Sequence, residues 1–223
     1  MARSGRRDAA RERAAEERRR QEQQRRRRRT LTIVAASVAA VVVAGGVTAG
    51  VLVGATPGAP DVGRTTAPPW SAPTDVGARV RAAGLTMLTA EGTALHTHQH
   101  LTITVDGTAV PVPADLGIDE AAQQLSAIHT HDTSGVIHVE SPEIRAFHLG
   151  QVFTEWNVRL APSTVGPYVN GKDGVVLAVF VNQRRYSGDP RKIALTRHED
   201  IDFVVTHGRA PVAPPKFDWP AGL

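Results

Sequence analysis

Apolar and polar residues alternate along several short segments of the chain, which is the pattern of strands with one buried face. In residues 98–105 the apolar side chains of Leu101, Ile103 and Val105 point one way, and histidines and threonines point the other way. Asp106-Gly107 follows as a hairpin turn, after which residues 108–112 return. Further strands are predicted at residues 128–131, 136–140, 177–181, 184–186 and 202–206.

A single segment shows helical periodicity instead. Apolar residues recur at positions 149, 152, 153 and 156, which predicts one amphipathic helix over residues 148–157. Residues 114–126 are expected to form a loop with about one helical turn. One main helix combined with many short strands predicts an α+β domain that has a mixed or antiparallel sheet.

The N-terminal part of the chain has the pattern of a membrane anchor. Residues 31–54 carry no charge over 24 positions, which is long enough to span a bilayer core. Residues 1–30 contain 13 arginines and five acidic residues, so the positive-inside rule places them in the cytoplasm and everything after residue 54 outside. We therefore predict a single-pass signal anchor. A cleaved signal peptide, with Val53-Gly54-Ala55 as the cleavage site, is the alternative.

Proline-rich segments flank the expected domain on both sides. Residues 55–75 contain five prolines and are predicted to be an extended linker, and residues 210–223 contain four prolines and are predicted to be an irregular tail. The predicted organisation is therefore a cytoplasmic tail (1–30), a transmembrane anchor (31–54), a linker (55–75), an extracytoplasmic histidine-rich domain (76–209) and a tail (210–223).

Composition narrows the chemistry. The chain has no cysteine, which excludes thiolate zinc sites, iron–sulfur clusters, blue-copper sites and disulfides. The net charge of +4 comes from residues 1–30, which carry +8, so the rest of the chain carries −4. A domain with this negative balance lacks the basic footprint of a nucleic-acid-binding protein.

Six of the nine histidines fall between residues 96 and 140, and their spacing is that of strands. Histidines two residues apart share one face of a strand, and in residues 136–140 the face opposite Ile137 and Val139 carries a histidine and a glutamate. Imidazole and carboxylate groups together suit a divalent transition metal. The predicted ligands are His98, His100, His129, His131, His138 and Glu140.

His96 and Asp132 lie near the predicted ligands in the sequence but are not among them. His96 is left out of this set because it lies furthest from the apolar residues that fix the strand direction. Asp132 is either a ligand, an acceptor that orients an imidazole, or an Asx-turn residue before Gly135.

Three motifs carry a resemblance to a known group of proteins. They are HTHQHLTITVDG at residues 96–107, HTHDTSGVIHVESP at residues 129–142 and LGQVF at residues 149–153. In this order they resemble a family of membrane-anchored or secreted proteins of actinobacteria and archaea. The resemblance implies an extracytoplasmic location and supplies no reaction. The C-terminal half also resembles a β-grasp module, with a helix, a hairpin and a closing strand.

These features predict a membrane-anchored, extracytoplasmic domain that binds copper or zinc for handling or sensing. Two other readings stay open: a ligand- or protein-binding β module with a structural histidine cluster, and a metal-dependent hydrolase or oxygenase. The first reading requires the two His-x-His strands to lie in one sheet or on facing sheets. Strands in one sheet are about 4.8 Å apart, close enough to share an ion.

Overall fold

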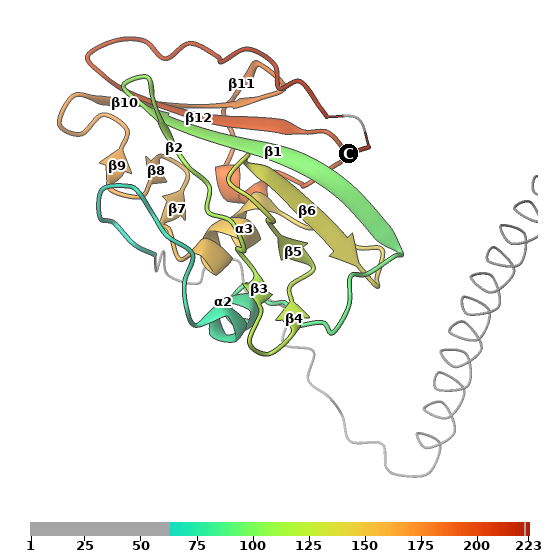
Figure 1. Ribbon diagram of the computed structural model, residues 1–223. Helices are drawn as coiled ribbons and strands as arrows, with labels where there is room; N and C mark the ends of the chain where they lie inside the picture. The colour runs from blue at the N-terminus through green and yellow to red at the C-terminus, as the bar shows by residue number, and fades with distance from the viewer. Residues whose placement is uncertain (1–62, 221) are drawn as a thin grey trace, which may run out of the picture. The chain divides into compact units, whose positions relative to one another are not determined.

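The computed structural model describes residues 63–220 and 222–223 (Figure 1). The arginine-rich tail, the predicted transmembrane segment at residues 31–54 and the first part of the predicted linker lie outside the described residues. Every helix found from residue 63 onward is too short or too polar to span a bilayer.

One mixed sheet of seven strands organises the domain. Its strands are β1 (Leu95–Val105), β2 (Thr108–Val110), β5 (Ile128–His129), β6 (Val136–Ser141), β10 (Val175–Val181), β11 (Arg184–Tyr186) and β12 (Asp200–His207). Their order is β11-β10-β12-β1-β6-β5, and β2 also pairs with β1. β1 and β12 are parallel, whereas the other pairs are antiparallel. The prediction of an α+β domain with a mixed sheet is confirmed.

β1 is the longest strand and has different neighbours along its length. Its first half pairs with β6, and its second half lies between β12 and β2. Gly135 allows β6 to begin close to β1, because a Cβ atom at this residue would lie 2.5 Å from the carbonyl oxygen of Leu101. Its φ of +86° is also one that L side chains rarely adopt.

Two helices contribute to the core: α2 (Val76–Ala82), which the sequence pattern did not predict, and α3 (Leu149–Trp156), which it did. α3 lies on one side of the main sheet (Figure 1). Its buried side chains belong to the same core as those of β1 and β12. Phe153 contacts Phe203 of β12, with ring centroids 5.5 Å apart. α3 ends at Trp156 and is capped by Asn157, which adopts the left-handed conformation typical of a helix C-terminus.

Several short elements complete the domain. They are β3 (Ile118–Asp119), β4 (Gln124–Leu125), β7 (Leu160–Ala161), β8 (Thr164–Val165), β9 (Tyr168–Val169) and the 3₁₀ helix η1 (Pro190–Lys192). β3 and β4 pair as a hairpin, so residues 114–126 contain a small two-stranded sheet where a helical turn was expected. Strands of two residues are too short to show a period of two.

The expected linker at residues 55–75 becomes part of the folded unit from residue 63 onward. Trp70 is only 2% exposed, and its ring meets that of Trp156 edge to face at 5.6 Å. The indole nitrogen of Trp156 donates a hydrogen bond to the carbonyl oxygen of Trp70. The guanidinium of Arg64 donates to the carbonyl oxygens of Trp156 and Ser71. The tryptophan and arginine contacts therefore anchor this proline-rich segment to the end of α3.

The C-terminal segment packs against the sheet without forming a helix or strand over residues 210–220. Ala213 contacts a small apolar cluster formed by Ala178, Phe180 and Val204. Further along, the backbone N–H of Phe217 donates to the carboxylate of Asp200 on β12. The irregular segment thus covers residues of β10 and β12 that face away from the main core.

Candidate metal centre

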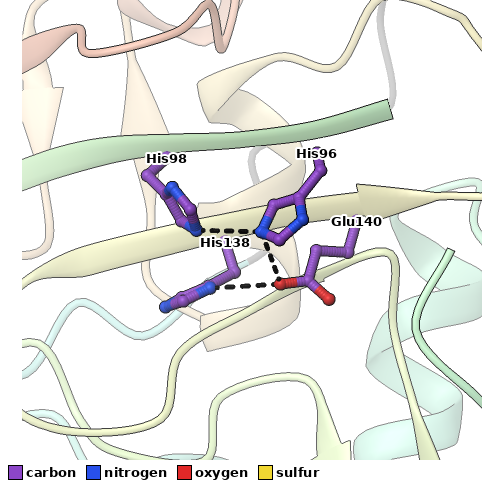
Figure 2. Close-up of side chains that lie close together, drawn as sticks. All are labelled: His96, His98, His138 and Glu140. Carbon is purple, nitrogen blue, oxygen red and sulfur yellow. Dashed lines mark hydrogen bonds and ion pairs between the residues drawn. The ribbon is translucent and has the colours of Figure 1, made fainter. Parts of the chain in front are cut away.

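The register of β1 and β6 brings four ligand side chains together. His96 is paired with Glu140, and His98 is paired with His138. Because residues two apart share a face, all four side chains project to the same side of the sheet. Figure 2 shows the two β1 histidines and the two β6 residues converging from neighbouring strands. We call His96, His98, His138 and Glu140 the first ligand group.

Three of the six distances between ligand atoms of the first ligand group match the edges of a tetrahedral metal site, and the others lie within 4.8 Å. Nε2 of His96 lies 3.2 Å from Nε2 of His98 and 3.2 Å from Oε1 of Glu140. The same Oε1 lies 3.3 Å from Nδ1 of His138. Tetrahedral zinc with bonds of about 2.0–2.1 Å separates its ligand atoms by about 3.3 Å. These three contacts therefore have the length of the edges of a zinc tetrahedron.

A bound cation accounts for these contacts better than hydrogen bonds do. Nε2 of a neutral imidazole carries either one proton or one lone pair. Nε2 of His96 therefore has at most one proton for its contacts with His98 and Glu140, which would share it as a weaker three-centre hydrogen bond. A cation between the three groups accounts for both distances, since every ligand atom then directs a lone pair toward it.

A second ligand group lies on the other side of His138. It consists of His129, His131 and His138, whose ligand atoms lie within 4.8 Å of one another. His129 is the β5 partner of His138, and their rings stack with centroids 5.4 Å apart. His131 meets both rings edge to face, at 4.8 Å from His129 and 4.5 Å from His138. His138 thus belongs to both groups.

His129 is held with one nitrogen free. Its side chain is fully buried, and its Nδ1 lies 3.0 Å from the carbonyl oxygen of Ser126. A carbonyl oxygen only accepts, so Nδ1 carries the proton and Nε2 carries a lone pair. Among the described residues Nε2 has no hydrogen-bond partner although it is buried. A backbone acceptor that fixes the tautomer in this way is typical of histidines that bind metals.

The surroundings keep the central imidazoles in the neutral form. Burial lowers the pKa of His129 to about 4 and that of His138 to about 3, and for His138 the neighbouring imidazoles act in the same direction. Burial, followed by the charge of His96, also lowers the pKa of His98. Neutral imidazole is the form that binds metal.

Glu140 is a carboxylate that a cation would stabilise. It is 4% exposed, and burial together with the nearby Glu91 carboxylate raises its pKa. Glu91, His129 and Glu140 also bring ligand atoms within 4.8 Å of one another. Two carboxylates beside neutral imidazoles give the centre a negative charge when both are ionised, which favours a divalent cation.

The structure brings together five of the six predicted ligands and places His100 elsewhere. Nδ1 of His100 lies 2.8 Å from the carboxylate of Asp200, and its ring stacks on Phe217 with centroids 3.7 Å apart. His100 is paired with Val136 on β6, two residues along β1 from the His98–His138 pair. The C-terminal segment then covers its ring. The prediction that His100 converges with the other histidines is therefore wrong.

Asp132 and the remaining histidines lie outside both ligand groups. The carboxylate of Asp132 accepts a hydrogen bond from the N–H of Ser134, which is the Asx turn that the sequence left open. His148 precedes α3, and Nε2 of His198 contacts the carbonyl oxygen of Leu223. His207 pairs with Asp106 at the protein surface.

Two residues of the centre were missing from the predicted set. His96 follows the same period of two as His98, and its pairing with Glu140 required only that the alternation extend two residues further. Glu91 precedes β1 in an irregular segment, where no periodicity indicates the direction of its side chain.

Comparisons of the chain with protein-family models, with curated proteins and with solved structures gave no match.

Proposed function

We propose that this protein binds a divalent transition metal, zinc or copper(II), in an extracytoplasmic domain held at the membrane by one N-terminal helix. The function is metal handling or sensing. The observation that carries the proposal is the first ligand group, in which three contacts of 3.2–3.3 Å have the length of tetrahedral edges.

The donor types agree with this choice of metals. Three imidazole nitrogens and one carboxylate oxygen suit zinc and copper(II), whereas magnesium and calcium prefer oxygen ligands throughout. Four protein ligands fill a tetrahedral site, as in zinc centres that bind without catalysing a reaction.

A purely hydrogen-bonded histidine cluster is less well supported. Nε2 of His96 has to share one proton between two contacts of 3.2 Å, and the buried Nε2 of His129 has no partner among the described residues. Leaving a buried polar atom unpaired costs about 1–3 kcal/mol. An ion in the first ligand group removes the first difficulty, and an ion bound by His129 removes the second.

The location at the membrane is inferred from the sequence. An arginine run precedes a 24-residue uncharged span, which favours a cytoplasmic N-terminus and a domain outside the cytoplasm. The resemblance of the three motifs to the actinobacterial and archaeal family named above favours the same location. We also propose a β-grasp-like fold, because α3, the β10–β11 hairpin and the closing strand β12 occur in the expected order.

Calorimetric titration of the metal-stripped full chain, prepared without a histidine tag, tests metal binding. The parent should bind zinc and copper(II), and His98→Ala should weaken binding at least about 100-fold, since even outer partners of ligands contribute 10–100-fold. His207→Ala is the matched control, because His207 lies outside both ligand groups. Absence of binding by the parent, or equal binding by His98→Ala, would contradict the proposal.

A further inference from the structure

We propose that the centre holds two metal ions side by side, joined by the imidazole ring of His138. This inference rests on the proposed metal-binding function and extends it from one ion to two. The first ion is bound by His96, His98, Glu140 and one ring nitrogen of His138, and the second by His129, His131 and the other ring nitrogen.

The position of His138 is the first reason. It is the single residue common to the two ligand groups, because β6 lies between β1 and β5. Its Nδ1 faces Glu140 at 3.3 Å, and Figure 2 shows its second ring nitrogen pointing away from Glu140. An imidazole has two nitrogens on different edges of the ring, so one ring can serve two ions on opposite sides.

The number of donors is the second reason. A zinc ion in a closed protein site takes four ligands. The first ligand group already supplies four, yet His129, His131 and Glu91 lie within 4.8 Å of its members. One ion therefore leaves ligand atoms unused, among them the buried and unpartnered Nε2 of His129. A second ion gives that atom a partner.

The two positions differ in their coordination. The first ion has four protein ligands, whereas the second has three imidazoles and so retains a position for water or another small ligand. Each ion position has one solvent-exposed histidine ligand, which is His96 for the first ion and His131 for the second. These two histidines each belong to one group alone, which allows the two ions to be removed separately.

Joint ligation changes the protonation of His138. A neutral imidazole carries one N–H, so binding an ion through each nitrogen requires that this proton leave the ring. The proton passes to the buffer, and the ring remains as an imidazolate that bridges two divalent ions. Two copper(II) ions bridged in this way couple magnetically, which weakens their electron paramagnetic resonance signal.

The experiment is a stoichiometric titration of the metal-stripped full chain with zinc and, separately, with copper(II). The parent and His207→Ala should each bind two equivalents. His96→Ala and His131→Ala should each bind one, since each substitution removes a ligand of one ion. The copper(II) form of the parent should give less spin per copper at two equivalents than at one.

The outcomes separate the two proposals. A parent that binds one equivalent, with a spin signal that grows in proportion to the copper bound, overturns the two-ion centre and leaves the proposed function intact. Two equivalents with full spin at each ion overturn the bridge through His138. A parent that binds no metal overturns both proposals.

Discussion

His98 and His138 are direct partners in the β1–β6 ladder, and their ring centroids lie 4.6 Å apart. On the other edge of β6, His129 is paired with the same His138. One imidazole therefore lies between two others on neighbouring strands. A slip of either ladder by one residue would turn these rings to the opposite face of the sheet. The candidate metal centre thus depends on the register of three strands.

The protonation of the central histidines gives a direct test of their environment. Burial lowers the pKa of His129 to about 4 and that of His138 to about 3, so both rings should stay neutral in the metal-free protein at pH 5. Histidine-selective ¹⁵N spectra should show His129 as the Nδ1–H tautomer there. The same chain in concentrated urea should titrate near 6.5. Charged imidazolium at both positions of the folded chain at pH 5 would contradict the described burial.

Glu155 should make the stability of the domain depend on pH. Its carboxyl is 1% exposed, accepts a hydrogen bond from Ser126, and has its pKa raised by burial from 4.5 to about 8. The folded state then keeps this proton at pH 7 and the unfolded state loses it. Stability from this group is therefore present below pH 4.5 and is lost as pH rises through about 8.

Glu155→Gln removes this dependence, because an amide is neutral in both states. At pH 7 the variant should exceed the parent in free energy of unfolding by about 3 kcal/mol, and the difference should vanish near pH 4.5. Urea denaturation of the variant and the parent at both pH values measures this difference in free energy of unfolding. Glu143→Gln, at an exposed carboxylate, is the control and should change little. An equal difference between Glu155→Gln and the parent at both pH values would refute the assignment.

The sheet and part of the site were predictable because apolar and polar residues alternate along every strand that has one face against the core. Leu101 and Ile103 fix the direction of β1, which in turn fixes the shared face of His98 and His96. The boundaries of β11 were predicted correctly for a related reason, since Asn182-Gln183 supplies the turn. Alternation with a period of two shows which face of the strand a side chain occupies. It does not show which other strand lies beside that strand.

The failures follow from that limit. His100 shares the face of His98, yet its neighbours are Asp200 of β12 and Phe217 of the C-terminal segment, which come from about 100 residues further along the chain. Trp70 was assigned to a linker because prolines surround it, whereas its burial against Trp156 depends on a distant helix. Contacts of this kind leave no local pattern in the sequence.

The predicted orientation in the membrane can be tested by labelling single cysteines, since the natural chain has none. Ser71→Cys places a thiol at an exposed position, and it should react with a membrane-impermeant reagent on intact cells. Ser4→Cys, at the arginine-rich end, should react only after the cells are opened. The reverse pattern would place the domain in the cytoplasm.

Metal content of the purified protein tests the central claim most directly. Three chains without a histidine tag are compared by elemental analysis: the parent, His98→Ala and His100→Ala. The two substituted histidines lie two residues apart on β1 and are both 8% exposed, but only His98 belongs to a ligand group. His100→Ala should lower the free energy of unfolding by about 1–3 kcal/mol through its lost bond to Asp200 and yet retain the metal. His98→Ala should lose the metal of the first ligand group; equal zinc or copper content in all three chains, or none in the parent, would contradict the account.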